Sequence, residues 1–250
     1  MKNEIKKGDI FLLGKHKLIN GDCTNPETVR KLFENEKASC IVADPPYGAV
    51  AVEAGQGFSK MKNHKPIIND HLQSDAEYEK FTQDWLDASK PFLESKNSIY
   101  IFNSDKMIFA LRNAMVRSGL HFAQLLVWVK THAVVGRLDY LPQHELLAYG
   151  WLGTHKFHRP KDKSVLVFPK PNKNTLHPTL KPLGLLRKII LNSSRTNEII
   201  YDPFGGVAST LLACEQTARR CFMIELDPEY CLKAIERYEK ATGNKAVKIN

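Results

Sequence analysis

The sequence predicts an α/β fold in which helices surround a mostly parallel, doubly wound sheet. Short apolar runs with the length of buried strands alternate with segments that begin with helix-capping signals. A helix between two such strands makes a βαβ unit and sets the strands parallel. Near the C-terminus, a strand, a glycine loop, a helix, a second strand and an acid follow one another. That order is typical of the nucleoside-binding half of such a sheet.

The N-terminal part is expected to form a β-hairpin followed by a helix and a buried strand. Two apolar runs flank the turn-like pair Gly14-Lys15. Asn25 is a candidate N-cap, and Pro26 suits the first position of a helix. The expected elements are strands at 10–13 and 17–20, a helix from 26 to about 35, and a strand at 39–43.

The rest of the chain continues the alternation. Ser74 opens a capping-box pattern, and Pro182 and Asp227-Pro228 suit the starts of later helices. Only one helix follows the strand that ends at Glu225, so we expect the N-terminal strand 17–20 to fill the sheet position beside it. Helices are expected at about 75–90, 105–118, 182–195, 207–218 and 228–241, and strands at 98–102, 122–130, 145–149, 198–201 and 220–224.

Composition indicates a globular protein with a polyanionic partner. The 250 residues, 43% of them hydrophobic, suit one large domain spanning residues 1–250, and no apolar run is long enough for a membrane span. The chain starts without the apolar stretch of a signal peptide, and its five cysteines are scattered. We therefore expect a cytoplasmic protein with reduced thiols and no metal site. The net charge of +9 favours DNA or RNA as partner.

Two segments lack a periodic pattern. Residues 48–74 are rich in glycine, small and polar residues, and we expect a mobile loop there. Residues 131–175 are rich in basic residues, histidine, proline and glycine apart from one strand, and we expect an insertion that recognises the target. A solvated loop surface is the alternative. The candidate contacts to phosphates or guanine edges are Arg137, Arg159, Lys161 and Lys163.

The motif Asp44-Pro45-Pro46-Tyr47 directly follows the buried strand 39–43. Because proline has no N–H and fixes φ, Pro45-Pro46 forms a stiff, extended turn with carbonyl acceptors. Asp44 adds a charged acceptor and Tyr47 a flat face. The motif suits the capture of a planar group that carries an amino function, such as a nucleobase. An ordinary strand-to-loop turn with a capping aspartate is the alternative.

A second motif, Asp202-Pro203-Phe204-Gly205-Gly206, lies between a strand and a helix. Its glycines let the backbone approach a ligand and turn sharply into the helix. Glu225 follows one strand later, near the separation expected for a carboxylate that binds ribose hydroxyls. A P-loop is excluded because no GK[ST] is present, and Ala208 stands where a second loop glycine would admit a pyrophosphate. A nucleoside without phosphates is therefore favoured.

Together these motifs resemble those of S-adenosylmethionine-dependent DNA amino-methyltransferases. Residues 44–47 resemble the catalytic motif of that family, and residues 202–206 resemble its cofactor loop. Further matches are the segment 177–182, which contains His177 and Lys181, and Gly21-Asp22-Cys23. The catalytic motif precedes the cofactor loop, which is the permuted order of the beta group. The resemblance extends over roughly residues 8–240.

The resemblance implies a Rossmann-like methyltransferase fold with a mostly parallel, seven-stranded sheet and an inserted basic recognition segment. It implies methyl transfer to the exocyclic amino group of a base flipped out of double-stranded DNA, with adenine N6 favoured by Asp44. Asp44 and the Pro45 carbonyl would hold the amino group, and Tyr47 would stack on the base. Cytosine N4 is one alternative. Another is a catalytically weak DNA-binding homologue, because Val207-Ala208 replaces the usual Ser-Gly.

The resemblance also implies the cofactor site and the biological setting. Asp22 is expected near the adenine amino group of S-adenosylmethionine, Glu225 at the ribose hydroxyls, and His177 and Lys181 near the methionine carboxylate. A capping role for Asp22 and a solvated cation at Lys181 are the alternatives. Homodimers and restriction–modification in a bacterium or phage are typical of the family. The expected cofactor residues are Asp22, Cys23, Asp44, His177, Lys181, Asp202, Phe204, Gly205, Gly206, Ser209, Thr210, Glu225, Leu226 and Asp227.

Overall fold

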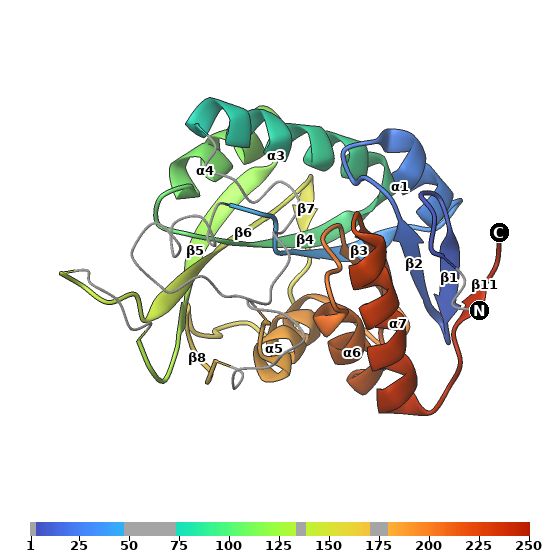
Figure 1. Cartoon of the computed structure of the whole chain (residues 1–250). Coiled ribbons are helices and arrows are strands. Elements are labelled where there is room, and N and C mark those ends of the chain that lie inside the picture. The colour runs from blue at the N-terminus through green and yellow to red at the C-terminus, as the bar shows by residue number, and fades with distance from the viewer. Residues whose placement is uncertain (1–3, 48–73, 134–138, 171–179) are drawn as a thin grey trace.

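The computed structural model describes residues 4–47, 74–133, 139–170 and 180–250. In this part of the chain, one sheet lies between two helical layers (Figure 1). The strands are β1 (Ile10–Leu13), β2 (His16–Asn20), β3 (Ala38–Ala43), β4 (Leu93–Asn103), β5 (His121–Val129), β6 (His144–Trp151), β7 (Thr154–His155), β8 (Val165–Val167), β9 (Ile199–Asp202), β10 (Arg220–Glu225) and β11 (Val247–Lys248). The α-helices are α1 (Pro26–Phe33), α3 (Asp75–Ser89), α4 (Ile108–Arg117), α5 (Leu183–Ser193), α6 (Ser209–Gln216) and α7 (Pro228–Thr242), with a 3-10 turn at Lys90–Phe92.

The sheet has the order β11-β1-β2-β10-β9-β3-β4-β6-β5-β8, and β7 pairs with β4 beside this path. The strands from β2 to β4 are parallel, and β6 runs antiparallel to both β4 and β5. The path from β2 to β5 contains the seven strands expected from the family. The count of seven was too low, because β1, β7, β8 and β11 add short or peripheral strands to the described sheet.

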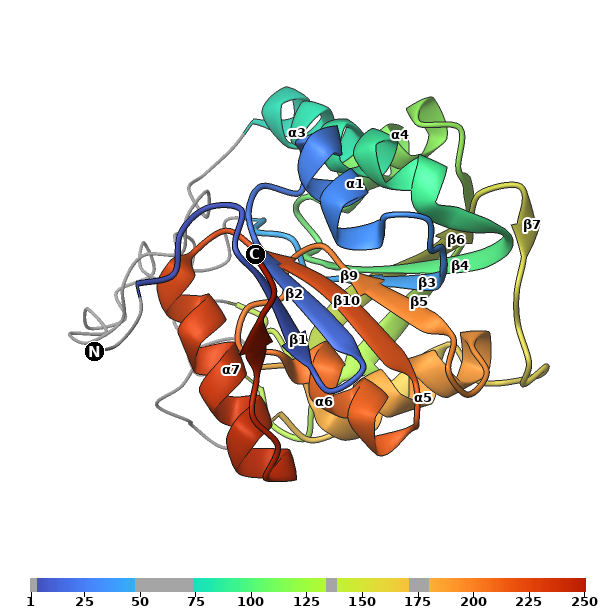
Figure 2. The same ribbon diagram turned by 90° about the vertical axis from the view of Figure 1, so that its right-hand side faces the viewer.

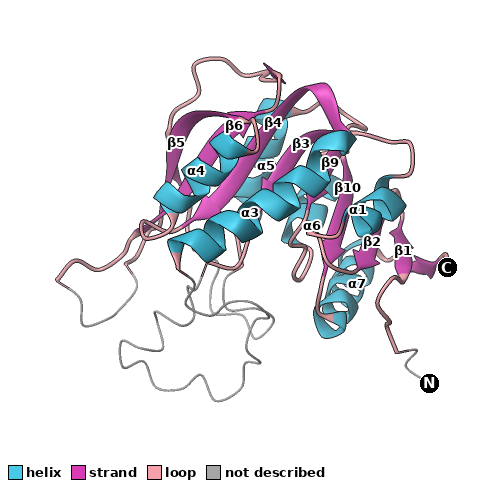
Figure 3. Ribbon diagram, turned by 90° about the horizontal axis from the view of Figure 1, so that it is seen from above, coloured by secondary structure: helices cyan, strands magenta, loops and turns pink. Residues whose placement is uncertain are grey.

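Two hydrophobic cores lie on opposite faces of the sheet. One joins α1, α3 and α4 to the strands, with Phe33, Trp85 and Leu111 fully buried. The other joins α5, α6 and α7 to the opposite face, around Leu186 and Leu211. Figure 2 shows the two helical layers edge-on, and Figure 3 looks onto the layer of α1, α3 and α4. This arrangement confirms the doubly wound fold.

Local capping signals predicted several helix starts correctly. The Asn25 side chain accepts a hydrogen bond from the Glu27 N–H at 3.0 Å and caps α1. Ser74 and Glu77 form the expected capping box of α3. Pro182, expected inside its helix, is instead the N-cap of α5, because its ψ of 130° is extended.

The N-terminal strand occupies the expected position next to β10. β2 pairs in parallel with β10, with Ile19 opposite Ile224 and Asn20 opposite Glu225. The Gly21 N–H donates to the Glu225 carbonyl at 2.9 Å, so the chain after β2 turns toward the end of β10. This pairing brings Asp22 to the same sheet edge as Glu225, as the topological argument predicted.

Several expectations lie wholly or partly outside the described residues. The expected mobile loop 48–74 is described only at Ser74, and Arg137 and His177 are not described. The expected insertion 131–175 contains β6, β7 and β8, so its described part adds strands to the sheet. None of the helices in the described ranges has the length and apolarity to span a bilayer.

Candidate functional site

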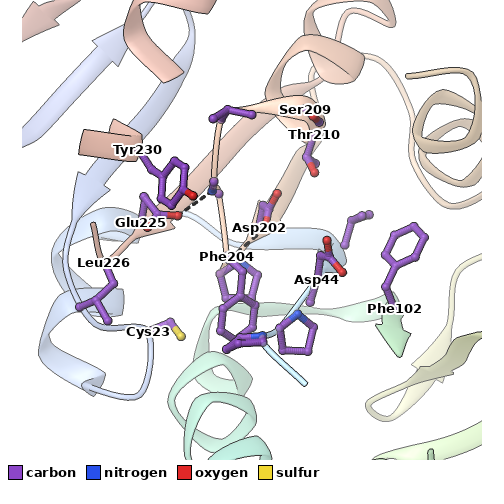
Figure 4. Close-up of a pocket in the computed structure, with 18 of the residues that line it drawn as sticks. Cys23, Asp44, Phe102, Asp202, Phe204, Ser209, Thr210, Glu225, Leu226 and Tyr230 are labelled. Atoms are coloured by element: carbon purple, nitrogen blue, oxygen red, sulfur yellow. Dashed lines mark hydrogen bonds between the residues drawn. The ribbon is translucent and has the colours of Figure 1, made fainter. Parts of the chain in front are cut away.

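A pocket opens at the carboxyl ends of the parallel strands β2, β3, β9 and β10. Ligands of doubly wound sheets bind at this edge because the loops there converge between the helical layers. The pocket walls come from the four segments 21–23, 44–47, 202–207 and 225–227, together with Lys181 and parts of α6 and α7. In Figure 4, Glu225 and Tyr230 lie toward one end of the pocket and Asp44 and Phe102 toward the other.

The structure brings together every expected catalytic and cofactor residue that it describes. Motifs separated by more than 150 residues in the chain thus face one cavity. The roles of the individual residues stay predictions. The expected residues that line the pocket are Asp22, Cys23, Asp44, Pro45, Pro46, Tyr47, Lys181, Asp202, Phe204, Gly205, Gly206, Ser209, Thr210, Glu225, Leu226 and Asp227.

Glu225 ends β10 with both carboxylate oxygens held by backbone donors. Oε2 accepts from the Gly206 N–H at 2.7 Å, and Oε1 accepts from the Asp227 N–H at 2.8 Å. Burial raises the pKa of Glu225 to about 7, against the effect of these two hydrogen bonds. The carboxyl group is fixed in orientation, which suits an acceptor for two neighbouring hydroxyls.

Asp202 ends β9 below the cofactor loop. Its Oδ1 accepts from the Phe204 N–H at 3.0 Å, which closes the turn. Burial raises the pKa of Asp202 to about 7, and the nearby charge of Asp44 adds to the rise. Gly205 suits this turn, because a Cβ there would lie 3.0 Å from Met223 Cε and 3.2 Å from the Ile224 carbonyl oxygen, so β10 would have to shift slightly.

Ala208 has a left-handed backbone, with φ of 64° and ψ of 39°. It is the N-cap of α6, which begins at Ser209, so the expected helix start at 207 was too early. A side chain with a Cβ is strained in this conformation, whereas glycine adopts it freely. The departure from the usual Ser-Gly of the family therefore falls on a position whose backbone favours glycine.

Aromatic side chains form the wall behind the cofactor loop. The Phe204 ring stands edge-on to Trp85, with centroids 5.5 Å apart, and lies 6.0 Å from Phe81. Cys23 also lines the pocket, and burial raises its pKa well above its usual range, so its sulfur stays a neutral thiol. The wall suits a flat, apolar ring system.

Asp22 has a local partner in addition to its place at the pocket. Its Oδ1 accepts from the Thr24 N–H at 2.9 Å and from the Thr24 hydroxyl at 2.8 Å. The helix cap belongs to Asn25. Asp22 therefore shapes the turn before α1 without capping the helix, and its expected role at the adenine amino group stays a prediction.

Lys181 is buried at the catalytic end of the pocket, with 6% of its side chain exposed. Its ammonium lies 2.7 Å from Asp44 Oδ2 and 3.2 Å from Glu145 Oε2, and 4.9 Å from the centre of the Phe102 ring. Burial alone would lower the pKa of Lys181, but the charges of Asp44 and Glu145 raise it. The alternative of a solvated cation is wrong, because this lysine is buried and ion-paired.

Sequence reasoning missed the residues behind Lys181. Glu145 is the second residue of β6, and its Oε1 lies 2.8 Å from the ammonium of Lys130, which directly follows β5. The available signal was the charge of Glu145 directly before the apolar run Leu146-Leu147-Ala148. A charge at the start of a buried strand is costly unless it has a partner. The pocket residues that the motifs did not indicate are Val42, Ala43, Phe81, Phe102, Leu186, Val207 and Tyr230.

Three of the expected DNA contacts lie away from the pocket. Arg159, Lys161 and Lys163 are exposed on the segment before β8. β8 runs parallel to β5 toward the pocket edge, so the residues before it lie on the opposite side. Asp162 fixes this segment to the last turns of α5 through Lys188, at 2.8 Å, and Asn192, at 2.7 Å. Contact with DNA at these positions stays a prediction. The described part of the chain holds no group of three or more metal-ligating side chains.

Comparisons with known proteins agree on one family. A family model described as DNA methylase matches residues 38–236. The Type II methyltransferase M.HinfI of Haemophilus influenzae is 26% identical over 258 residues, which covers 91% of this chain and 69% of the relative. The Type II methyltransferase M2.DpnII of Streptococcus pneumoniae is 25% identical and covers 95% of this chain and 97% of the relative.

Solved structures show the same fold. The complex of M1.HpyAVI with SAM has a TM-score of 0.67 at 24% identity, covering 88% of this chain and 97% of that structure. The cytosine-N4-specific PvuII DNA methyltransferase also has a TM-score of 0.67, at 15% identity, covering 92% and 91%. Because the DNA methylase model matches most of the chain, this protein belongs to the N6/N4 DNA methylase family, as the motifs at Asp44 and Asp202 predicted.

Proposed function

We propose that this DNA methylase transfers a methyl group from S-adenosylmethionine to adenine N6 of a base flipped out of double-stranded DNA. The observation that carries the proposal is the position of Asp44-Pro45-Pro46-Tyr47, which opens into the same pocket as Glu225 and the loop 202–206. An amino-binding motif and a nucleoside-binding motif thereby share one cavity. Restriction–modification is the setting suggested by the Type II relatives.

The nucleoside end of the pocket fits the cofactor. Glu225 is fixed by two backbone N–H groups and is directed at the cavity beside Gly206, where ribose hydroxyls could donate to it. Phe204 and Leu226 add apolar surface for a flat ring. When bound, S-adenosylmethionine supplies a methyl group activated by its sulfonium. The solved complexes of M1.HpyAVI and of the Thermus thermophilus protein TTHA0409 with this cofactor support the assignment.

The catalytic end fits an exocyclic amino group. The lone pair of such a nitrogen is delocalised into the base, so it attacks poorly. Asp44 and the Pro45 carbonyl accept hydrogen bonds from the amino hydrogens, which directs the lone pair at the methyl carbon and stabilises the developing positive charge. In the reaction, a bond would form between the amino nitrogen and the methyl carbon, and the S–C bond would break with its electron pair left on sulfur. The nitrogen would then release one proton to solvent.

Tyr47 packs against the hydrophobic core beside this end of the pocket. In the proposed complex its ring stacks on the flipped base, which replaces part of the stacking lost from the duplex. Extrusion of a base costs roughly a few kcal/mol. We take double-stranded DNA as the substrate. A homodimer, a cytoplasmic location and a bacterial or phage source stay predictions.

The test is methyl transfer from radiolabelled S-adenosylmethionine to unmethylated duplex DNA, followed by nucleoside digestion and mass spectrometry. The expected product is N6-methyladenine, and N4-methylcytosine would select the second reading. Asp44→Asn is expected to abolish transfer while cofactor binding persists. Turnover by that variant would refute the role of Asp44. DNA binding without transfer by the wild type would favour a catalytically weak homologue.

A further inference from the structure

A chain of four charged groups leads from the catalytic motif into the protein. Asp44 contacts Lys181 at 2.7 Å, Lys181 contacts Glu145 at 3.2 Å, and Glu145 contacts Lys130 at 2.8 Å. We call these residues the charge quartet. Negative and positive groups alternate along it, so two carboxylates and two ammonium groups sum to zero. Glu145 and Lys130 do not line the pocket, so they act on a substrate only through Lys181 and Asp44.

The topology of the sheet gathers the quartet at one edge. Asp44 follows the carboxyl end of β3, and Lys130 follows the carboxyl end of β5. β6 is antiparallel to β5, so its first residues, including Glu145, lie at this same edge. The Lys130 N–H donates to the Gln143 carbonyl at 2.8 Å, and the Gln143 side chain donates back to the Lys130 carbonyl at 3.0 Å. Both ends of the β5–β6 connection are therefore fixed next to the quartet.

The two lysines of the quartet are buried, whereas the side chains of Asp44 and Glu145 are 28% and 17% exposed. Lys130 and Lys181 are 5% and 6% exposed, and each ammonium also lies near an aromatic face, that of Trp128 or Phe102. The contact of Glu145 Oε2 with Lys181, at 3.2 Å, is longer than that of Glu145 Oε1 with Lys130, at 2.8 Å. Burial alone would raise the pKa of Glu145, but Lys181 and Lys130 lower it. Each charged group of the quartet is therefore stabilised by the oppositely charged group beside it.

We propose that Glu145 and Lys130 are positioning residues of the methyl-transfer centre, which together set how tightly Lys181 holds the catalytic carboxylate of Asp44. Lys181 lies between two carboxylates that compete for it. Its ammonium lies closer to Asp44, at 2.7 Å, than to Glu145, at 3.2 Å. In the proposal this difference arises because Lys130 offsets part of the charge of Glu145. The inference rests on the proposed role of Asp44.

The loss of Lys130 and the loss of Glu145 are expected to have opposite effects on the contact between Lys181 and Asp44. Without the charge of Lys130, Glu145 draws Lys181 away from Asp44, and the carboxylate loses its fixed orientation. Without the charge of Glu145, Asp44 is the carboxylate that stays paired with Lys181 among the described residues, and Lys181 competes more strongly with the amino group of the base for it. Removal of both charges restores neutrality and leaves one ion pair at Asp44. Removal of one partner from a buried ion pair lowers stability because the remaining charge is uncompensated.

The experiment compares Lys130→Met, Glu145→Gln and the double variant in two measurements. The first is the single-turnover rate of methyl transfer with cofactor and DNA saturating. Each single variant is expected to lose about 10- to 100-fold, the scale of a misplaced catalytic group, and the double variant to recover most of the loss. Lys130→Arg keeps the charge and is expected to retain the rate. If Lys130→Met does not fold, Glu145→Gln carries the test.

The second measurement uses the protein alone. The ¹³C carboxyl signal of Asp44, assigned with Asp44→Asn, is titrated without cofactor or DNA. The titration midpoint is expected to rise in Lys130→Met, to fall in Glu145→Gln and to lie near the wild-type value in the double variant. Because no reaction is needed, this result is independent of the proposed methyl transfer. If the wild type transfers no methyl group, the proposed function is refuted, but the Asp44 titration still tests whether Lys130 and Glu145 act on Asp44.

The chain offers a matched control. Lys156 also lies between two carboxylates, 2.9 Å from Glu94 and 2.7 Å from Glu198, and none of these three residues lines the pocket. Glu198→Gln is therefore expected to leave both the rate and the Asp44 titration unchanged. The proposal is overturned if Glu145→Gln keeps the wild-type rate and titration, or if the losses of the two single variants simply add in the double variant.

Discussion

The ammonium of Lys181 lies 2.7 Å from Oδ2 of Asp44, so a buried cation is bonded to the first residue of the catalytic motif. The two residues are 137 positions apart in the sequence, and they meet because α5 begins where β3 ends. The pKa of Lys181 is raised by Asp44 and Glu145 despite burial, which keeps the lysine charged over the working pH range. A charged lysine in turn favours the ionised form of Asp44, the form that accepts hydrogen bonds.

Lys181→Met tests this relationship. Asp44 and Glu145 lose their shared cation, and we expect unfolding to become easier by about 3 kcal/mol, the scale of a broken buried ion pair. The single-turnover rate is expected to fall by about 100-fold because Asp44 is no longer held. Urea unfolding and rapid-quench methyl transfer measure the two effects. Lys156→Met is the control: it removes a lysine from between two carboxylates, and its rate is expected to match the wild type.

Cofactor affinity in Lys181→Met separates two roles for this lysine. An isothermal titration with S-adenosylmethionine is expected to show unchanged affinity if Lys181 acts on Asp44 alone. A clear loss of affinity would support the other prediction, contact with the methionine carboxylate. The structure pairs the ammonium with two carboxylates already, so we expect the first outcome.

Cofactor binding is expected to depend on pH through Glu225. Its pKa of about 7 means that below neutrality the carboxyl group is protonated and loses acceptor capacity for the ribose hydroxyls. Affinity is therefore expected to weaken by about tenfold from pH 8 to pH 6, with proton release on binding below pH 7. Calorimetry in buffers of different ionisation enthalpy measures both. In Glu225→Gln this part of the pH dependence should vanish, and titration of the cofactor itself cancels in the comparison.

The stability of the protein without cofactor has the opposite pH dependence. Asp202 and Glu225 both have pKa values raised to about 7, above the ordinary carboxyl value of about 4. Their raised values favour the folded state below pH 4, and this stabilisation is lost as pH rises toward 7. Between pH 5 and 8, the melting temperature of Asp202→Asn is expected to fall less with rising pH than that of the wild type. An equal decline in both proteins would contradict the prediction for Asp202.

Features set by neighbouring residues were predictable from the sequence, and features set by distant contacts were not. The caps at Asn25 and Ser74 were found because their hydrogen bonds stay within three residues. The quartet contact between Lys130 and Glu145 depends on the antiparallel register of β5 and β6, which leaves no local signal. The short strand β8 likewise forms only because β5 lies beside it.

The catalytic and cofactor motifs were recognisable because each combines special backbone residues with an acid. A Cβ at Gly205 would make tight contacts with β10, and Pro45-Pro46 stiffens the turn after β3. The left-handed backbone of Ala208 was not predictable, because alanine gives no sign of it.

The exposed cations before β8 are expected to affect DNA affinity and not the chemical step. These cations, Arg159, Lys161 and Lys163, lie on the side of the sheet away from the pocket. From there they could contact only DNA phosphates that are distant from the target base. The triple glutamine variant is expected to lower the slope of log affinity against log salt by about 0.9 for each lost phosphate contact. Filter binding at several salt concentrations measures the slope, and the single-turnover rate at saturating DNA is expected to stay unchanged.

A triple variant of other exposed lysines is the control for that experiment. Replacement of Lys31, Lys37 and Lys240 by glutamine removes the same charge from other parts of the surface. If both triple variants change the slope equally, the effect comes from net charge, and the segment before β8 makes no specific contact. If only the first changes it, phosphate contacts at that segment are supported.

Ala208→Gly is expected to stabilise the protein by about 1 kcal/mol, because glycine relieves the strain of a left-handed backbone at φ of 64°. The gain is reduced by the greater freedom of glycine in the unfolded chain and by the loss of a buried methyl group. Ala213→Gly is the matched control, since Ala213 is equally buried but lies within α6, where glycine costs about 1 kcal/mol. Urea unfolding of the two variants should therefore shift in opposite directions. A shift of Ala208→Gly toward lower stability would show that the methyl group contributes more to packing than the strained backbone costs.

Cofactor affinity, measured alongside, is expected to rise in Ala208→Gly because a relaxed loop holds the Gly206 N–H in line with Glu225 more easily.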